Sequence, residues 1–212
     1  MFRKSLIYLI VCLSGYSGAS GQIINAGAKI FIGPGASVFV PETFKSTSGS
    51  VLNNGLLTVK GDWYNHDANG KVFDNRSTGK VMLSGDNQVI AGNSVTVFPD
   101  LELGGTGVKS LDQSAEVSGS LILNDKEFVL KSNDLTVSNP RADAVTRTTG
   151  FINTDQGGSL IRATNATTGY IFPFGSSASA RYSPIVIEPK ATSANSFAAS
   201  LFNNSPTING NM

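Results

Sequence analysis

The aromatic residues Trp63 and Tyr64, followed by His66, are the side chains of this sequence that best suit sugar binding. A carbohydrate site needs a flat aromatic face beside polar groups, so Trp63 and Tyr64 are the candidate ligand-binding residues. Neighbouring residues of a strand point to opposite faces, however, and these two rings would not form one platform. Packing of the aromatic rings within the fold is the alternative, and the pattern favours it.

Oxygen-bearing side chains recur at alternate positions nearby, at Asn65, Asp67 and Asn69, and Gly70 follows. This spacing is similar to the start of a calcium-binding loop, which closes with a bidentate glutamate at its twelfth position. Arg76 occupies that position here and would repel the cation. A hairpin turn at Asn69-Gly70 is the favoured interpretation. Zinc binding is not expected either, because the chain has a single histidine and its one cysteine lies in the export signal described below.

Acidic residues occur at matching positions of two similar segments, as Asp62 and Asp86. Stacked carboxylates at such positions are what a polysaccharide-cleaving β-helix needs. The next two segments carry Gly105 and Asp125 at this position, so the row has a gap. Capping of turns explains such a row better than catalysis does. The sequence therefore predicts no catalytic residue, no metal, no cofactor and no enzymatic activity.

Composition narrows the function classes further. The chain has 212 residues, a formal net charge of +1 and 15% charged residues, against about 25% in an average globular protein. Because lysine and arginine are not in excess, a nucleic-acid partner is excluded. A hydrophobic content of 40% is enough to form a core and argues against disorder, and one cysteine excludes a disulfide scaffold.

The N-terminal segment has the layout of a secretory signal peptide. Arg3 and Lys4 precede an apolar stretch at residues 5–13, and small residues lead to a cleavage point between Ala19 and Gln22. The apolar stretch is shorter than the ~20 residues that a stable membrane anchor needs. We therefore expect a secreted, extracellular or cell-surface protein with no membrane span after cleavage. A buried first strand or helix is the alternative.

Short alternating apolar segments, bounded by Gly, Asn or Asp, recur along the body of the chain. Their first inward-facing residues are predicted to be Leu57, Val81, Leu101, Leu121 and Leu135, at steps of 24, 20, 20 and 14 residues. A step near 20 suits one coil of a β-solenoid, in which each coil buries its apolar side by stacking on the next. We therefore predict an all-β, parallel β-helix-like solenoid. An antiparallel β-sandwich, whose strands recur every ~8–12 residues, is the alternative.

The pattern changes near residue 150, where longer strand-like segments begin. The expected domain organisation has three parts. These are a signal peptide over residues 1–21, a β-solenoid repeat region over residues 22–150, and an incomplete β-rich module over residues 151–212.

Several segments of the chain carry a family resemblance. They are LTVKGDWYN at residues 57–65, VMLSGDNQVIAG at 81–92, FPDLEL at 98–103, YIFPFG at 170–175 and RYSPIVI at 181–187. In this order they resemble the strand–turn repeats of large exported surface proteins of the Bacteroidetes and a segment often found downstream of those repeats. Such proteins are commonly cargo of the type IX secretion system, and many are adhesin-like. The C-terminal sorting domain usual in that cargo is not recognisable in this sequence.

These observations predict a non-enzymatic secreted or cell-surface protein with a structural, adhesin-like role. The expected partner is an extracellular glycan or a surface matrix. One alternative is a carbohydrate-binding module that presents Trp63 or Tyr64, and a second is a β-helix enzyme that degrades a polysaccharide through Asp62 and Asp86. The oligomeric state stays open.

Overall fold

The computed structural model describes residues 21–177 and 181–202 of the chain. Apart from Gly21, the predicted signal peptide lies outside these residues, as does the segment after residue 202. Strands dominate the described part, and its one helical segment is the 3₁₀ turn η1 (Ala142–Ala144). No helix within the described ranges is long and apolar enough to cross a membrane.

The strands of the body form three sheets, which we name A, B and C. Sheet A contains β1 (Ile23–Ile32), β3 (Phe44–Asn53), β5 (Trp63–Asn65), β7 (Gln88–Gly92), β10 (Lys109–Leu111), β13 (Glu127–Val129) and β16 (Phe151–Asn153). Sheet B contains β2 (Ser37–Val40), β4 (Leu56–Val59), β6 (Lys80–Leu83), β9 (Asp100–Leu103), β12 (Leu121–Ile122) and β15 (Val145–Thr146). Sheet C contains β8 (Thr96–Phe98), β11 (Ala115–Val117), β14 (Leu135–Val137), β17 (Leu160–Thr164) and β22 (Asn195–Ala199).

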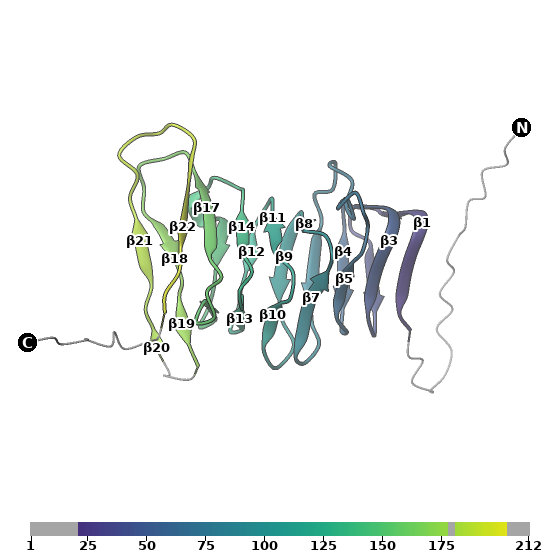
Figure 1. Ribbon diagram of the computed structural model, residues 1–212. Coiled ribbons are helices and arrows are strands. Elements are labelled where there is room, and N and C mark those ends of the chain that lie inside the picture. The colour runs from purple at the N-terminus through teal and green to yellow at the C-terminus, as the bar shows by residue number, and fades with distance from the viewer. Residues whose placement is uncertain (1–20, 178–180, 203–212) are drawn as a thin grey trace, which may run out of the picture.

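The chain winds through these sheets as a β-solenoid of about seven coils, stacked along one axis in Figure 1. Coil one consists of β1 and β2, coil two of β3 and β4, and coil three of β5 and β6. From β7 onward each coil also supplies a strand to sheet C. Pairing between successive coils is parallel throughout the body, as between β4 and β6. The solenoid prediction is therefore confirmed, and the antiparallel sandwich is excluded.

Equivalent residues of successive coils stand in register along sheet B. One inward column contains Val38, Leu57, Val81, Leu101, Leu121 and Val145. Four of the five predicted inward residues therefore occupy this column. The prediction is wrong for Leu135, which lies in β14 of sheet C and is paired with Ala115. Strands of sheets B and C have the same alternation of inward and outward residues. The turn η1 precedes the sixth strand of sheet B, β15, which begins only at Val145.

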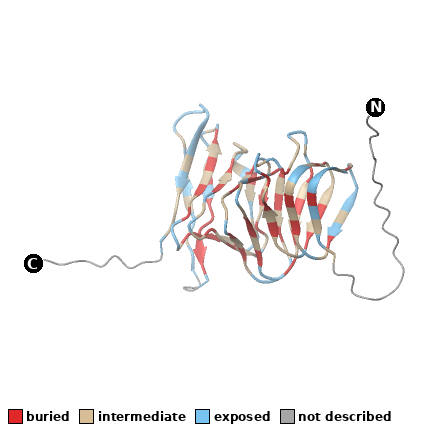
Figure 2. Cartoon of the chain, turned by 45° about the vertical axis from the view of Figure 1, so that its right-hand side comes forward, coloured by how far each residue is buried: buried red, intermediate tan, exposed pale blue. Residues whose placement is uncertain are grey.

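The core follows the alternation of apolar residues along each strand. In β4 and β6 every second side chain points inward, and Leu57, Val59, Val81 and Leu83 are each at most 1% exposed. Figure 2 shows that buried positions recur from coil to coil along the stack. Each such Val or Leu contributes about 1.5–3 kcal/mol of hydrophobic stabilisation, which a single coil could not supply.

The parallel stack continues beyond residue 150. Strands β16 and β17 pair in parallel with β13 and β14, so the boundary predicted near residue 150 falls inside the solenoid. Antiparallel pairing begins afterwards, between β18 (Tyr170–Phe172) and β21 (Ile185–Ile187) and between β19 (Gly175–Ser176) and β20 (Arg181–Tyr182). Strand β22 pairs antiparallel with β17 and thereby occupies the last edge of sheet C.

Candidate functional site

Trp63 is a core residue and does not present its ring to a ligand. It is 0% exposed, and its indole ring stacks on Phe44 at 4.3 Å between centroids and on Phe73 at 5.6 Å. The ring also contacts Phe98, and its Nε1 donates a 3.0 Å hydrogen bond to Thr96 Oγ1. The predicted ligand-binding role is therefore corrected for Trp63, because strand alternation turns this position inward.

Tyr64 occupies the opposite, outer face of β5. Its ring lies parallel to that of His66, with 6.0 Å between centroids and 7° between planes. Residues two apart on a strand share a face, so the aromatic pair on the surface is Tyr64 with His66. The Tyr64 hydroxyl donates a 3.4 Å hydrogen bond to Asp62 Oδ2. Partial burial raises the pKa of Tyr64, and the carboxylates of Asp62 and Asp112 raise it further.

The segment between β5 and β6, residues 66–79, is the region of the predicted calcium-like spacing, and we name it loop 66–79. Asn65 Nδ2 donates to the carbonyl of Val95 at 3.0 Å, and Asn65 Oδ1 accepts the amide of Asp67. Asp67 Oδ1 in turn accepts the amide of Asn69 at 2.8 Å. These side chains hold a turn, although not a hairpin, because both sheet neighbours of β5 pair with it in parallel. No group of three potential metal-binding His, Cys, Asp or Glu residues occurs in the part of the chain that the structure describes.

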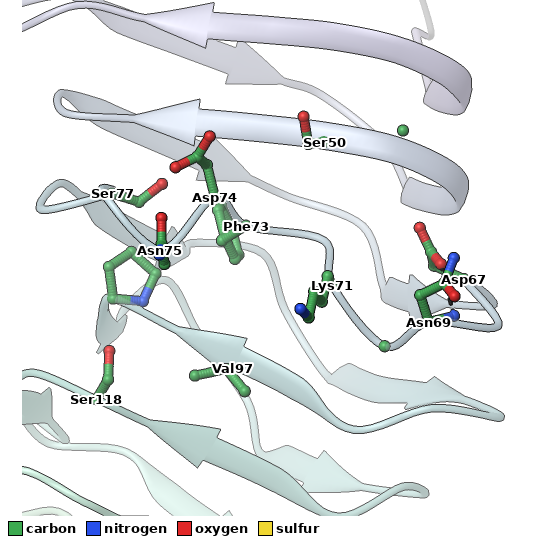
Figure 3. A pocket seen from close by; sticks show the side chains of 13 residues that line it. Ser50, Asp67, Asn69, Lys71, Phe73, Asp74, Asn75, Ser77, Val97 and Ser118 are labelled. Carbon is green, nitrogen blue, oxygen red and sulfur yellow. Dashed lines mark hydrogen bonds between the residues drawn. The ribbon is translucent and has the colours of Figure 1, made fainter.

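An open cleft of about 840 Å³ lies beside loop 66–79, and Figure 3 shows it at close range. Across the coils, Asp67 and Asn69 lie on one side, Asp74, Asn75 and Ser77 lie on the other, and Lys71 lies between them. Along the stack the cleft is lined by Ser50 of coil two, by Phe73 of coil three, by Val97 and Pro99 of coil four, and by Ser118 of coil five. The cleft therefore crosses several coils, parallel to the solenoid axis.

Charge within the cleft is largely balanced. The Arg76 guanidinium binds Asp74 through two contacts of 2.8 and 2.9 Å and holds the pKa of that carboxyl well below its usual value. Asp67 and Lys71, which have opposite charges, are the other ionisable groups of the lining. The cleft is therefore lined by polar groups but has little net charge.

Asp62 and Asp86 of the predicted carboxylate row bind groups of adjacent coils, whereas Asp125 binds its chain neighbour Lys126. Asp62 Oδ1 accepts the amide of Val89 at 2.8 Å, and Asp86 Oδ1 accepts the hydroxyl of Thr106 at 2.9 Å. Asp125, also in that row, contacts Lys126 at 2.9 Å, and this contact lowers the pKa of the carboxyl. These contacts link and cap turns, as the spacing of the residues predicts.

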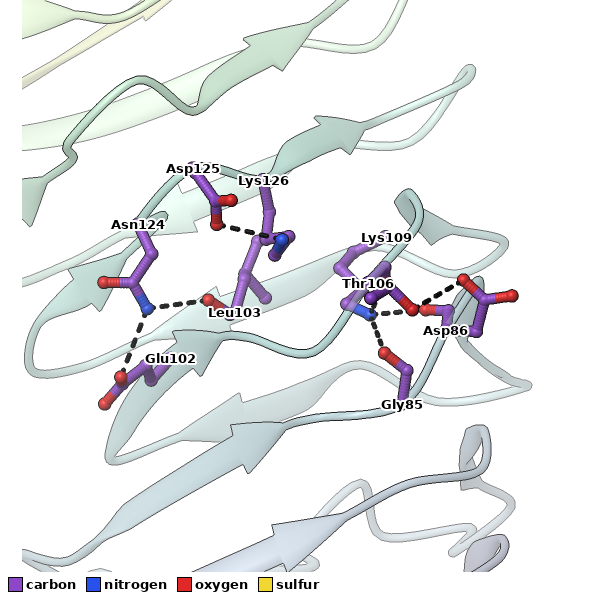
Figure 4. Close-up of polar contacts among 9 residues, drawn as sticks. All are labelled: Gly85, Asp86, Glu102, Leu103, Thr106, Lys109, Asn124, Asp125 and Lys126. Atoms are coloured by element: carbon purple, nitrogen blue, oxygen red, sulfur yellow. Dashed lines mark hydrogen bonds and ion pairs between the residues drawn. The ribbon is translucent and has the colours of Figure 1, made fainter.

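Lys109 is a buried cation that sequence reasoning missed. Its ammonium donates to the carbonyls of Gly85 at 2.9 Å, Asp86 at 2.5 Å and Thr106 at 2.9 Å, as Figure 4 shows. Burial, together with the nearby charge of Lys126, lowers the pKa of Lys109 to about 8. The side chain thus joins the corners of coils four and five and is not available to a substrate.

Comparison with protein-family models, with curated proteins and with solved structures finds no match for this chain. One sequence signal could have located the cleft, since the step from Leu57 to Val81 is 24 residues where the two following steps are 20. Loop 66–79 lies within that longer step.

Proposed function

We propose that this protein is a non-enzymatic structural, adhesin-like protein of the cell surface or the extracellular space. The observation that carries the proposal is that aspartate carboxylates bind backbone amides of the neighbouring coil. Asp62 Oδ1, Asp100 Oδ1 and Asp134 Oδ1 each accept a backbone amide from the following coil, at 2.8, 2.6 and 3.0 Å. Carboxylates engaged in this way stabilise the stack, and together with the continuous core they favour a stiff scaffold that displays its outer faces.

Export is the second part of the proposal. It rests on the signal-like residues 1–21 and on the resemblance of the repeats to exported surface proteins of the Bacteroidetes. Type IX secretion is the route that this resemblance favours. The outer faces of the solenoid would then meet an extracellular glycan or a surface matrix.

Incubation of the secreted full chain with suspended polysaccharides tests the absence of catalysis. We expect the protein to sediment with at least one polymer while the concentration of reducing ends stays constant. Release of reducing ends that disappears in Asp62→Asn and Asp86→Asn would instead establish a polysaccharide-degrading enzyme. Protease treatment of intact cells tests the location, because a surface protein is digested and an internal one is protected.

A carbohydrate-binding module is the second candidate function, and the parallel rings of Tyr64 and His66 on the outer face of β5 favour it. The carboxylates of Asp62 and Asp112 that act on Tyr64 could accept sugar hydroxyls. Loss of glycan binding in Tyr64→Ala, with an unchanged melting temperature, would support this candidate. Unchanged binding in Tyr64→Ala would remove the ring pair from consideration.

A further inference from the structure

We propose that the cleft beside loop 66–79 binds a neutral, extended glycan that lies along the solenoid axis. This inference rests on the proposed adhesin-like function and names its ligand class and its site. It assigns binding to a site other than the Tyr64–His66 pair, because neither of these rings lines the cleft, which is bordered by residues within 67–77 of the loop, by Ser50 of β3, by Val97 of β8, and by Pro99 and Ser118.

The cleft exists because coil three departs from the repeat. Coil three supplies β5 to sheet A and β6 to sheet B, but within the described residues sheet C begins only at β8 of coil four. Loop 66–79 occupies the place where coil three, as the structure describes it, has no strand of sheet C. It is bonded to coil two, because Val51 N donates to Val72 O at 2.8 Å and Asp74 N donates to Val51 O at 2.9 Å. The two halves of the loop therefore border a depression in a face that is otherwise formed by strands.

The dimensions of the cleft suit a polymer. Its lining extends from Ser50 in coil two to Ser118 in coil five. Neighbouring coils are spaced by about 4.8 Å, so the cleft follows the stack for roughly 14 Å. A pyranose ring is about as long as this spacing, and successive sugars could therefore meet successive coils. The cleft is open, so a chain longer than the site can continue past both ends.

The chemistry of the lining suits sugar rings. Phe73, Val97 and Pro99 supply apolar surface, and Val97 is 40% exposed. Asn69 and Asn75 stand on opposite sides of the cleft, and the structure records no hydrogen bond to either side-chain amide among the described residues. An amide offers two donors and an acceptor, which matches neighbouring hydroxyls of a sugar. Apolar side chains can pack against a face of a pyranose ring while the amides bind the hydroxyls at its edge.

Charge and order favour a neutral glycan over an acidic polymer. Asp74 is paired with Arg76 at 2.8 Å, and the remaining pair of Asp67 and Lys71 has no net charge. Both ends of the loop are preformed, because Asp67 accepts the amide of Asn69 and Asp74 accepts the amide of Arg76 at 3.1 Å. A preordered site loses little conformational entropy when a ligand binds.

The test is affinity gel electrophoresis of the secreted full chain in gels that contain neutral glucans, mannans or galactans, or the acidic polymers polygalacturonate and heparin. We expect retardation by at least one neutral polymer. In the double variant Asn69→Ala/Asn75→Ala, the apparent affinity should fall at least about tenfold, since hydrogen bonds to the ligand are lost on both sides of the cleft. Val97→Trp, which fills the middle of the cleft from an exposed position, should have a similar effect.

Two control variants make the result specific. Asn165→Ala removes an exposed asparagine amide far along the chain and should leave binding unchanged. Tyr64→Ala should also leave binding unchanged if the cleft is the site. Circular dichroism and the melting temperature check the fold of every variant. Binding that survives both cleft variants, binding to acidic polymers alone, or no retardation by any neutral polymer would overturn the assignment. Binding that is lost only in Tyr64→Ala would overturn it while leaving the adhesin-like function in place.

Discussion

Replacing Trp63 with alanine should destabilise the third coil severely. The indole ring is fully buried and packs against Phe44, Phe73 and Phe98. Truncation of a buried tryptophan costs about 3–5 kcal/mol through lost packing and the cavity left behind. The hydroxyl of Thr96 also loses its hydrogen-bond donor, which adds about 1 kcal/mol. We therefore expect the free energy of unfolding to fall by about 4–6 kcal/mol.

Urea denaturation followed by circular dichroism measures this loss for the variant. Trp63 is the only tryptophan, so in the unmodified protein its fluorescence reports on the surroundings of coil three. In a stacked repeat each coil contacts only its neighbours, and the first three coils can therefore unfold before the remainder. A separate early transition in the variant would have this cause. Tyr64→Ala is the matched control, because the outer ring is only half-buried and its loss should cost below about 1 kcal/mol.

The opposite result would refute the register of β5. A slip of one residue moves every side chain of a strand to the other face. If Tyr64→Ala destabilised the protein by several kcal/mol while Trp63→Ala had little effect, Tyr64 would be the inward residue. Exposure of Trp63 to an aqueous quencher in the folded protein would indicate the same inversion. Trp63 would then return as a candidate ligand-binding residue.

Substitutions at Gly92, Asp62 and Lys109 test the coil corners. Gly92→Ala should abolish folding or cost several kcal/mol, because the φ of Gly92 is +132° and a Cβ would lie 1.9 Å from a carbonyl oxygen of the neighbouring coil. Gly35→Ala is the control. Its φ is +73° but the surrounding space is open, so it should cost only about 1 kcal/mol in the same denaturation assay. Asp62→Ala should lower the melting temperature through loss of the acceptor for the Val89 amide, whereas Asp62→Asn should retain most of the stability if the oxygen and not the charge matters. Lys109→Met should be destabilising at neutral pH by about 1–3 kcal/mol, since three carbonyls lose their donor. The pKa of Lys109 is about 8 in the folded state and about 10.4 in the unfolded state, so between these pH values the unfolded state binds more protons. The stability of the unmodified protein should therefore rise with pH in that window, relative to Lys109→Met.

The repeat could be predicted because alternation and spacing are local properties of a sequence. Segments such as residues 55–62 and 79–86 have apolar residues at the same alternate positions and similar polar residues at their ends. A step near 20 residues between such segments makes a stacked coil the simplest arrangement. The assignment of strands to sheets could not be obtained in this way. Leu135 shows the limit, since strands of sheets B and C have the same alternation and only the intervening turns decide where each one lies.

The cleft lies beyond sequence reasoning for a related reason. Asn65 and Asp67 have the spacing of calcium ligands, but in the structure their side chains satisfy the backbone of the loop and of the next coil. Which polar groups are already bonded, and which face solvent, depends on contacts between coils. Asn69 and Asn75 are candidate binding residues only because the fold places them on the two sides of one cleft.

The corner between sheets B and A explains why a solenoid with few charges buries a lysine. Lys109 stands in register with Gln88, one coil earlier. Gln88 Nε2 donates to the carbonyls of Val59 at 3.1 Å and Gly61 at 2.5 Å, just as Lys109 donates to carbonyls of the coil before its own. A neutral amide and a cation thus fill equivalent places, so the corner requires donors and not charge. Lys109→Gln should therefore keep more stability than Lys109→Met and should lose the dependence on pH between about 8 and 10.4, because glutamine does not titrate. If Lys109→Gln were as damaging as Lys109→Met, the positive charge itself would hold the corner together.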